Sequence, residues 1–289
     1  MDFTEDLENG RNSLNLSNKV LGAGIYFTLF WIIVNYAMYG LSATLAWKLG
    51  YTPWFSIDGL SSLAGTEGWR ARYIAIVFAL PPSMAMVLSI ASRIAFNWVS
   101  PFRTHIRTGL FWFSIATFVF HYGHILSGLG YLASEIPKLF TGYVALYTWM
   151  RLEPETITII LVLQAIFSIS WILVYVPLIF RLGYSRKLLR SNSTKMKVFW
   201  PTFFWPCAVA FMLSAVATLP LNFYQFLTQW VVCLIVVGVS FAGFHMFNAP
   251  NTQVVKGGLA NRSNAYYFLL VVLIIAVARL LLSKPVFPY

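Results

Sequence analysis

The sequence predicts an all-α protein, a polytopic transmembrane helical bundle with seven spans plus one interfacial or re-entrant segment. Of its 289 residues, 59% are hydrophobic and only 10% are charged, whereas soluble domains carry about 25% charged residues. A soluble fold of this length could not bury so much apolar surface. Apolar stretches long enough to cross a bilayer, about 20 residues each, recur along the chain.

The chain divides into three predicted parts. Residues 1–19 form a polar, acidic segment that is expected in the cytoplasm, because it lacks the basic start and short apolar core of a signal peptide. Residues 20–283 form a single predicted transmembrane domain, and 284–289 are a short tail. The seven predicted spans are Val20–Trp47, Tyr73–Trp98, Gly109–Ala133, Thr156–Phe180, Val198–Leu219, Phe226–Phe247 and Ala265–Ser283.

An eighth apolar run, Ile136–Met150, is too short for a span and contains Lys138 and Gly142. The positions of the basic residues in the loops indicate whether this run crosses the membrane. The loop 181–197 carries only basic charges and is expected inside, since basic residues concentrate in cytoplasmic loops. Counting back from that loop, Arg103 and Arg107 fall inside only if Ile136–Met150 does not cross. We therefore predict a cytoplasmic N-terminus, an outer C-terminus and a non-crossing Ile136–Met150.

The net charge of +11 has the same explanation. No soluble domain remains that could bind nucleic acid, so the basic residues are interpreted as topology signals. The predicted partners are the lipid bilayer and other membrane protein subunits, and the predicted location is the bacterial cytoplasmic membrane.

Ionisable groups inside a membrane are costly, and each is a functional candidate. All nine acids lie outside the centres of the spans, which argues against a proton-coupled pump. His121 and His124 lie on one face of the third span, and His245 ends the sixth. His121 and His245 are the candidate cofactor-binding pair, because two histidines on different helices can ligate a haem iron. The favoured interpretation is that the histidines hydrogen-bond between helices, and no catalytic residue, metal site or cofactor is predicted.

Prolines and small residues indicate how the helices bend and pack. Prolines inside spans bend helices and free backbone carbonyls, and they occur here at Pro81, Pro82, Pro177, Pro201 and Pro206. The pairs Gly123 with Ser127 and Gly238 with Ala242 have the four-residue spacing of close helix packing.

The stretch Asn35–Pro53, NYAMYGLSATLAWKLGYTP, resembles the zinc-binding helix of the site-2 class of intramembrane metalloproteases. Gly40, Ala43, Ala46, Gly50 and Tyr51 fit that frame, and Ile76–Ala91 resembles the helix that follows it. The positions of the two zinc ligands hold Ala37 and Leu41, and the position of the general base holds Met38. The resemblance therefore implies a catalytically inactive relative without the zinc ligands.

The function predicted from the sequence is that of a non-catalytic structural or assembly subunit of a larger membrane complex. One alternative is a transporter or channel for a neutral or hydrophobic solute, using the proline-kinked helices with Asn35, His121, His124 and Gln164. Another is a membrane haem or metal protein using His121, His124 and His245.

Overall fold

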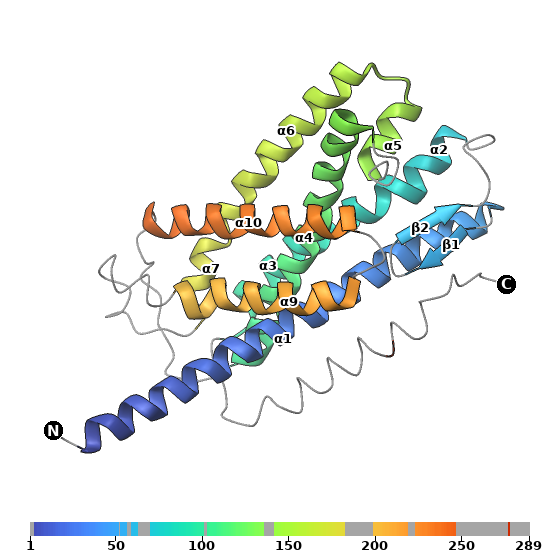
Figure 1. Ribbon diagram of the computed structural model, residues 1–289. Helices are drawn as coiled ribbons and strands as arrows, with labels where there is room; N and C mark the ends of the chain where they lie inside the picture. The colour runs from blue at the N-terminus through green and yellow to red at the C-terminus, as the bar shows by residue number, and fades with distance from the viewer. Residues whose placement is uncertain are drawn as a thin grey trace.

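The computed structural model describes residues 3–51, 53–56, 59–62, 70–100, 103–135, 142–182, 199–218, 223–246 and 277. Long helices dominate these residues (Figure 1), which confirms the predicted helical class. Four stretches are long and apolar enough to cross a membrane, Val20–Lys48, Ala75–Trp98, His105–Ser134 and Pro154–Phe180, and Trp200–Leu213 and Trp230–Met246 are shorter apolar helices.

The elements follow the order of the predicted spans. The first half of the chain contains α1 (Phe3–Lys48), β1 (Pro53–Ser56), β2 (Gly59–Ser62), α2 (Ala71–Ile74), the π-helical segment η1 (Ala75–Ala79), α3 (Leu80–Trp98) and α4 (Thr104–Ser134). The second half contains α5 (Gly142–Trp149), α6 (Pro154–Leu173), α7 (Val176–Phe180), the π-helical segment η4 (Trp200–Phe204), α9 (Trp205–Thr218) and α10 (Phe223–Met246). The seventh predicted span, Ala265–Ser283, lies outside the described residues except for Val277, which is helical and exposed.

The structure describes residues on both sides of the first predicted span. Helix α1 begins at Phe3, so residues 3–19 of the predicted polar segment are helical and continuous with that span. After α1, strands β1 and β2 form an antiparallel hairpin in which Pro53 pairs with Ser62 and Ser56 with Gly59. The fold is therefore helical with one short β-hairpin within the described residues.

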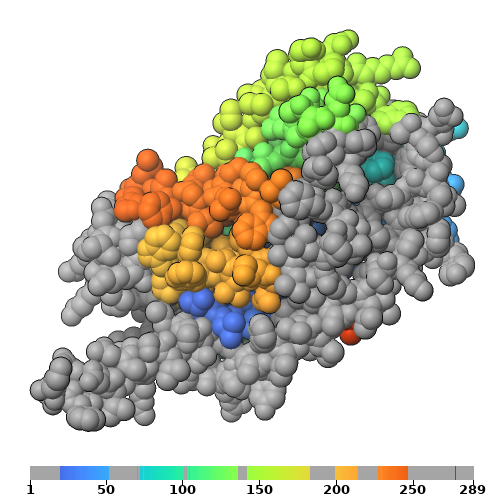
Figure 2. Space-filling view, viewed as in Figure 1, coloured from blue at the N-terminus to red at the C-terminus, as the bar shows by residue number. Residues whose placement is uncertain are grey.

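Side-chain contacts show that successive long helices alternate in direction. Phe30 of α1 contacts Phe113 of α4, and Tyr39 contacts Phe120, so α1 and α4 run parallel. Helix α3 runs opposite to α4, because Ser89 is bonded to Ser114 while the earlier Pro82 meets the later His121. Helices α9 and α10 are antiparallel to each other, since Phe199 lies against Phe244 and Phe211 against Trp230. Figure 2 shows these two helices side by side on one face.

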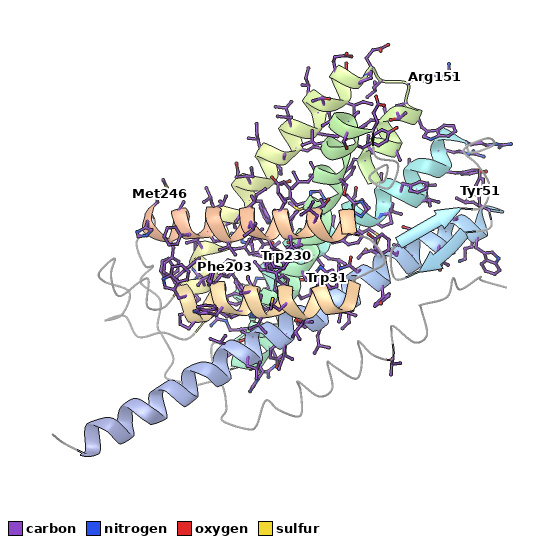
Figure 3. The ribbon with its side chains drawn as sticks, viewed as in Figure 1. Trp31, Tyr51, Arg151, Phe203, Trp230 and Met246 are labelled. Carbon is purple, nitrogen blue, oxygen red and sulfur yellow. The ribbon has the colours of Figure 1, made fainter. Side chains whose placement is uncertain are left out.

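Helices α4 and α6 are antiparallel, and the described part of the predicted non-crossing segment Ile136–Met150 lies between them in the chain. Gly128 near the end of α4 meets Leu161 near the start of α6, and Ser114 near the start of α4 meets Tyr175 beyond the end of α6. The chain therefore leaves α4 and enters α6 at the same end of the molecule, where Figure 3 labels Arg151. Of this segment the structure describes the eight-residue helix α5, and its non-crossing character stays a prediction.

Helix α4 lies at the centre of the bundle and contacts α1, α3, α5, α6 and α10. Of the four candidate spans it is the least apolar and the most buried, with 78% of its most apolar stretch inside the protein. Helix α6 is the most apolar and the least buried, with 28% inside. A bilayer explains this order, because only helices shielded from lipid can carry polar residues at low cost.

The prolines act as the sequence predicts. Pro81 and Pro82 open α3 directly after the π-helical segment η1, and Pro201 lies within η4. Pro177 follows a turn at Val174 and Tyr175 that separates α6 from α7. A proline removes one backbone donor and clashes with the preceding turn, which explains why the regular hydrogen-bond pattern changes at each of these positions.

The small-residue prediction was wrong for both glycines. A Cβ atom added at Gly123 or at Gly238 would meet no described atom within 4 Å, and Ala242 is exposed. The close approach of helices occurs instead at Gly24, where a Cβ would lie 2.9 Å from Val209 Cγ1, and at Gly128, where it would lie 3.0 Å from Leu161 Cδ1. Spacing alone could not distinguish a glycine that faces another helix from one that faces outward.

The antiparallel arrangement of α4 and α6 predicts how single cysteines react. Ser134→Cys and Glu153→Cys, both at exposed positions, should be labelled by a membrane-impermeant maleimide from the same side of the membrane. His105→Cys, exposed near the start of α4, should be labelled from the other side, and the buried thiols of Cys207 and Cys233 should give little background. Labelling of Ser134→Cys and Glu153→Cys from opposite sides would contradict the antiparallel pairing.

The two glycine environments predict opposite effects of enlargement. Gly24→Leu should destabilise the protein by about 1–3 kcal/mol, because its side chain would overlap Val209 and the bundle is closely packed there. Gly238→Leu, the matched control, should leave stability unchanged or raise it, because glycine is a poor helix former. Thermal unfolding in a mild detergent measures both, and equal effects of the two substitutions would show that Gly24 is not a packing position.

Candidate functional site

Three polar side chains of α4, buried or half-buried, lie on one seam between α3 and α4. Arg107 stacks on Phe96, Ser114 bonds to Ser89, and the ring of His121 meets the carbonyl oxygen of Pro82. Along α4 these three positions are separated by seven residues, and along α3 their partners are separated by seven residues in the reverse direction. Seven residues make nearly two helical turns, so all three contacts lie on the same face of each helix.

His121 is the centre of the candidate site. Its ring is buried, and Nδ1 lies 3.1 Å from the carbonyl oxygen of Pro82 and 3.0 Å from the hydroxyl of Tyr143. The Tyr143 hydroxyl also lies 3.2 Å from Oγ of Ser83. These groups, named here the histidine network, come from α3, α4 and α5, and they join the short helix α5 to two long helices.

The local sequence explains why α3 presents these groups. Pro81 and Pro82 have no backbone N–H, so the first turn of α3 lacks two α-helical donors. The hydroxyl of Ser83 donates to the carbonyl oxygen of Ala79 at 2.8 Å, supplying a side-chain donor within this irregular turn. The site of contact with His121 is therefore the point where the helix is least regular.

Chemically, the histidine network is a chain of hydrogen bonds without a carboxylate. If Nδ1 of His121 carries the proton, it donates to the Pro82 carbonyl; in the other tautomer it accepts from the Tyr143 hydroxyl. The acids among the described residues lie at the start of α1 (Glu5, Asp6 and Glu8), at the end of α4 (Glu135) or at the start of α6 (Glu153 and Glu155). The network can hold three elements together, but it lacks the acid that would orient His121 as a general base.

His124 fixes the start of α5 on α4. Gly142 has a positive φ of 57°, and a Cβ atom there would lie 2.7 Å from Nδ1 of His124. The same ring packs against Phe120 and Tyr39, with centroids 4.7 and 6.3 Å away. Only glycine allows both this backbone conformation and this close approach.

A second polar cluster lies two turns along α4. Ser89 and Ser114 each donate to the other's backbone carbonyl, at 2.9 and 2.7 Å, and both hydroxyls meet that of Tyr175. Tyr175 lies at the break between α6 and α7, so this serine–tyrosine cluster joins three helices. Interhelical hydrogen bonds of this kind contribute about 0.6 kcal/mol each on average.

The remaining residues of the predicted polar group also contact protein. Gln164 of α6 donates to the hydroxyl of Tyr147 of α5 at 2.7 Å. Asn35 is buried and donates to the carbonyl oxygen of Trp31 in its own helix at 2.7 Å. These contacts lie between or within helices and so stabilise the bundle.

The structure does not bring His121 and His245 together. His245 is exposed near the end of α10, directly after Phe244, which stacks on Phe180 at 4.4 Å and contacts Phe199. That contact lies toward the start of α4, since the next ring along, Phe203, meets Phe111. Phe111 is about 15 Å along α4 from His121 at about 1.5 Å per residue. Two axial ligands must reach one iron from its two faces, and this geometry does not support the predicted pair.

The positions that resemble zinc ligands differ in their surroundings. On α1, Ala37 is exposed, Leu41 is half-buried and Met38 is buried. Within the described ranges, His, Cys, Asp and Glu form no group of three that could hold a metal ion.

No protein-family model, no curated protein and no solved structure matches this chain. The resemblance to the site-2 class of metalloproteases therefore stays a hypothesis from the sequence.

The sequence interpretation identified His121 but missed Tyr143 and Ser83 of the histidine network. It also missed the serine–tyrosine cluster of Ser89, Ser114 and Tyr175. Nothing in the local sequence marks these residues as hydrogen-bond partners. One signal was present: Ser114, Thr117, His121 and His124 recur at three- and four-residue spacing along α4, which places them on one helical face. Such a polar stripe indicates that this face is turned away from lipid.

A double-mutant cycle tests the histidine network. Tyr143→Phe and His121→Ala should each destabilise the protein, and the double variant should lose less than the sum by about 0.6–1.7 kcal/mol, because both remove the same interhelical bond. Ser89→Ala, in the separate serine–tyrosine cluster, is the control and should add independently to Tyr143→Phe. Unfolding in mixed micelles measures each term, and full additivity of the first pair would exclude a bond between them.

Proposed function

We propose that this chain is a non-catalytic integral membrane protein that serves as a structural or assembly subunit of a larger membrane complex. One observation carries the proposal: the polar side chains in the interior bind one another across helices. The histidine network joins α3, α4 and α5, and the serine–tyrosine cluster joins α3, α4 and the α6–α7 break. A structural subunit needs helices that keep fixed positions, and these interhelical hydrogen bonds hold them in place.

The outer surface supplies apolar area for partners. Large apolar side chains point outward from three helices, with Val87 of α3 63% exposed, Phe167 of α6 67% exposed and Leu234 of α10 63% exposed. Lipid tails and the apolar spans of other subunits both suit such a surface. The proposal assigns part of it to partner subunits and the rest to lipid.

The proposal includes a location in the bacterial cytoplasmic membrane with the N-terminus inside. Its support is the distribution of charge: the stretch 183–198 contains five basic residues and no acid, as expected of a cytoplasmic loop. The acids Glu135, Glu153 and Glu155 occur where the chain passes from α4 to α6, at the opposite end of α4 from Arg107.

The two alternatives have less support. A transporter needs polar side chains along a path that water can enter, whereas His121 and Gln164 are bonded to neighbouring helices. A haem protein needs two ligands at one depth, and His121 and His245 belong to different levels of the bundle. A visible spectrum of the purified protein with a Soret band would restore the haem alternative.

Purification in a mild detergent followed by mass spectrometry tests the proposal. We expect a fixed set of other membrane proteins in constant ratio to this chain, because a scaffold subunit is extracted together with its neighbours. A photo-crosslinking residue in place of Val87, Phe167 or Leu234 should give a discrete adduct with one of those partners from at least one face. Position Ala116, fully buried in α4, is the control and should give none. A chain that purifies alone and gives no protein adduct from any of the three faces would exclude the subunit function.

A further inference from the structure

Three arginines from three parts of the fold gather at one end of the bundle. Arg93 lies in the last turns of α3, Arg107 in the first turn of α4, and Arg181 directly after α7. Arg181 donates to Asn97, which lies one helical turn beyond Arg93. Arg107 lies over Phe96, the residue before Asn97. All three are half-buried, so their charges are only partly solvated and repel one another.

Each guanidinium group contacts an uncharged neighbour, so the contact does not balance its positive charge. Arg93 lies over the ring of Trp171 with its Cζ atom 5.0 Å from the centroid, and Arg107 lies over Phe96 at 4.4 Å. Arg181 donates from Nη1 to Oδ1 of Asn97 at 2.8 Å. Stacking on an aromatic ring occupies the face of a guanidinium group and leaves the donors at its edge available.

Donors of all three arginines lack acceptors. The Nε atoms of Arg93, Arg107 and Arg181 are buried and have no hydrogen-bond partner among the described residues. A buried donor without an acceptor is costly, and a cluster of like charges adds to that cost. An anion with several acceptor oxygens would relieve both.

The chain does not supply that anion from its described acids. Glu135, Glu153 and Glu155 lie at the other end of α4 and α6, and Glu135 is about 42 Å from Arg107 along α4 at about 1.5 Å per residue. Glu5, Asp6 and Glu8 belong to the N-terminal part of α1. Since Phe30 lies level with Gly109, Glu8 is about 30 Å beyond the level of Arg107 along the helix axis.

We propose that Arg93, Arg107 and Arg181 form a binding site for the phosphate group of an anionic phospholipid. Arginine binds phosphate through pairs of parallel N–H donors, and basic pockets between transmembrane helices on the cytoplasmic side bind anionic head groups. Trp98 is the last residue of α3, a little more than one helical turn beyond Arg93. Its side chain is 83% exposed, as expected of an aromatic residue at head-group level. The arginines therefore lie at the depth of lipid phosphates, which favours a phospholipid over a soluble anion.

Lipid-binding measurements test this site on the full chain in nanodiscs of phosphatidylcholine. Adding phosphatidylglycerol or cardiolipin should raise the melting temperature and give bound lipid in native mass spectra. Arg93→Gln, Arg107→Gln and Arg181→Gln should each weaken that binding about tenfold, which corresponds to about 1.4 kcal/mol per charged contact. Arg93→Lys should also weaken it, because lysine keeps the charge but loses the planar pair of donors.

Controls separate a built site from general attraction. Arg103→Gln removes an exposed charge at the start of α4 and should leave lipid binding within about twofold; an equal loss in this variant would show that the surface attracts lipid without a site. Inorganic phosphate at millimolar concentration should not compete, and effective competition would assign the site to a soluble anion. If the arginine variants bind lipid like the parent while remaining folded in phosphatidylcholine, the site does not exist.

Discussion

The antiparallel seam between α3 and α4 is the interaction on which the rest of the bundle depends. Its three polar contacts, at Arg107, Ser114 and His121, recur every seven residues, so one register places all of them at once. A shift of a single residue would turn these side chains out of the seam and expose them to lipid. Because polar groups in hydrocarbon must find partners within the protein, the register of this helix pair is strongly determined.

At each of the three contacts along the seam, one further element of the fold packs against α3 and α4. At the level of His121, the Tyr143 hydroxyl brings in α5; at the level of Ser114, the Tyr175 hydroxyl brings in the break between α6 and α7. At the level of Arg107, Arg181 follows the end of α7 and donates to Asn97. Asn97 is the residue after Phe96, over which Arg107 lies. The seven-residue repeat that aligns α3 and α4 thus also positions the histidine network, the serine–tyrosine cluster and the group of arginines at the end of the bundle. At the first two levels the polar groups bond to other groups of the protein. At the third level the Nε donors of Arg93, Arg107 and Arg181 have no acceptor among the described residues.

The order of burial shows how the chain divides its surface between protein and lipid. The least apolar candidate span, α4, is the most buried, and the most apolar, α6, is the most exposed. Close packing of α4 is obtained with large rings, for example Trp112, which lies between Phe27 of α1 and Phe203 of η4. The central helix is therefore specific in its contacts, while the outer helices need only be apolar.

The sequence by itself determined the helical class of the protein and the approximate positions of its long apolar helices, because hydrophobic length is a local property of the chain. It also marked the prolines where the helices become irregular. It could not show that Tyr143 meets His121, or that Gly24 and not Gly238 lies in a helix contact. Those facts depend on which helix faces meet and at what depth, and residues far apart in the chain fix them jointly. Only the tertiary structure could decide that Arg93, Arg107 and Arg181, three ordinary charges at span ends, lie together without a carboxylate among the described residues around them.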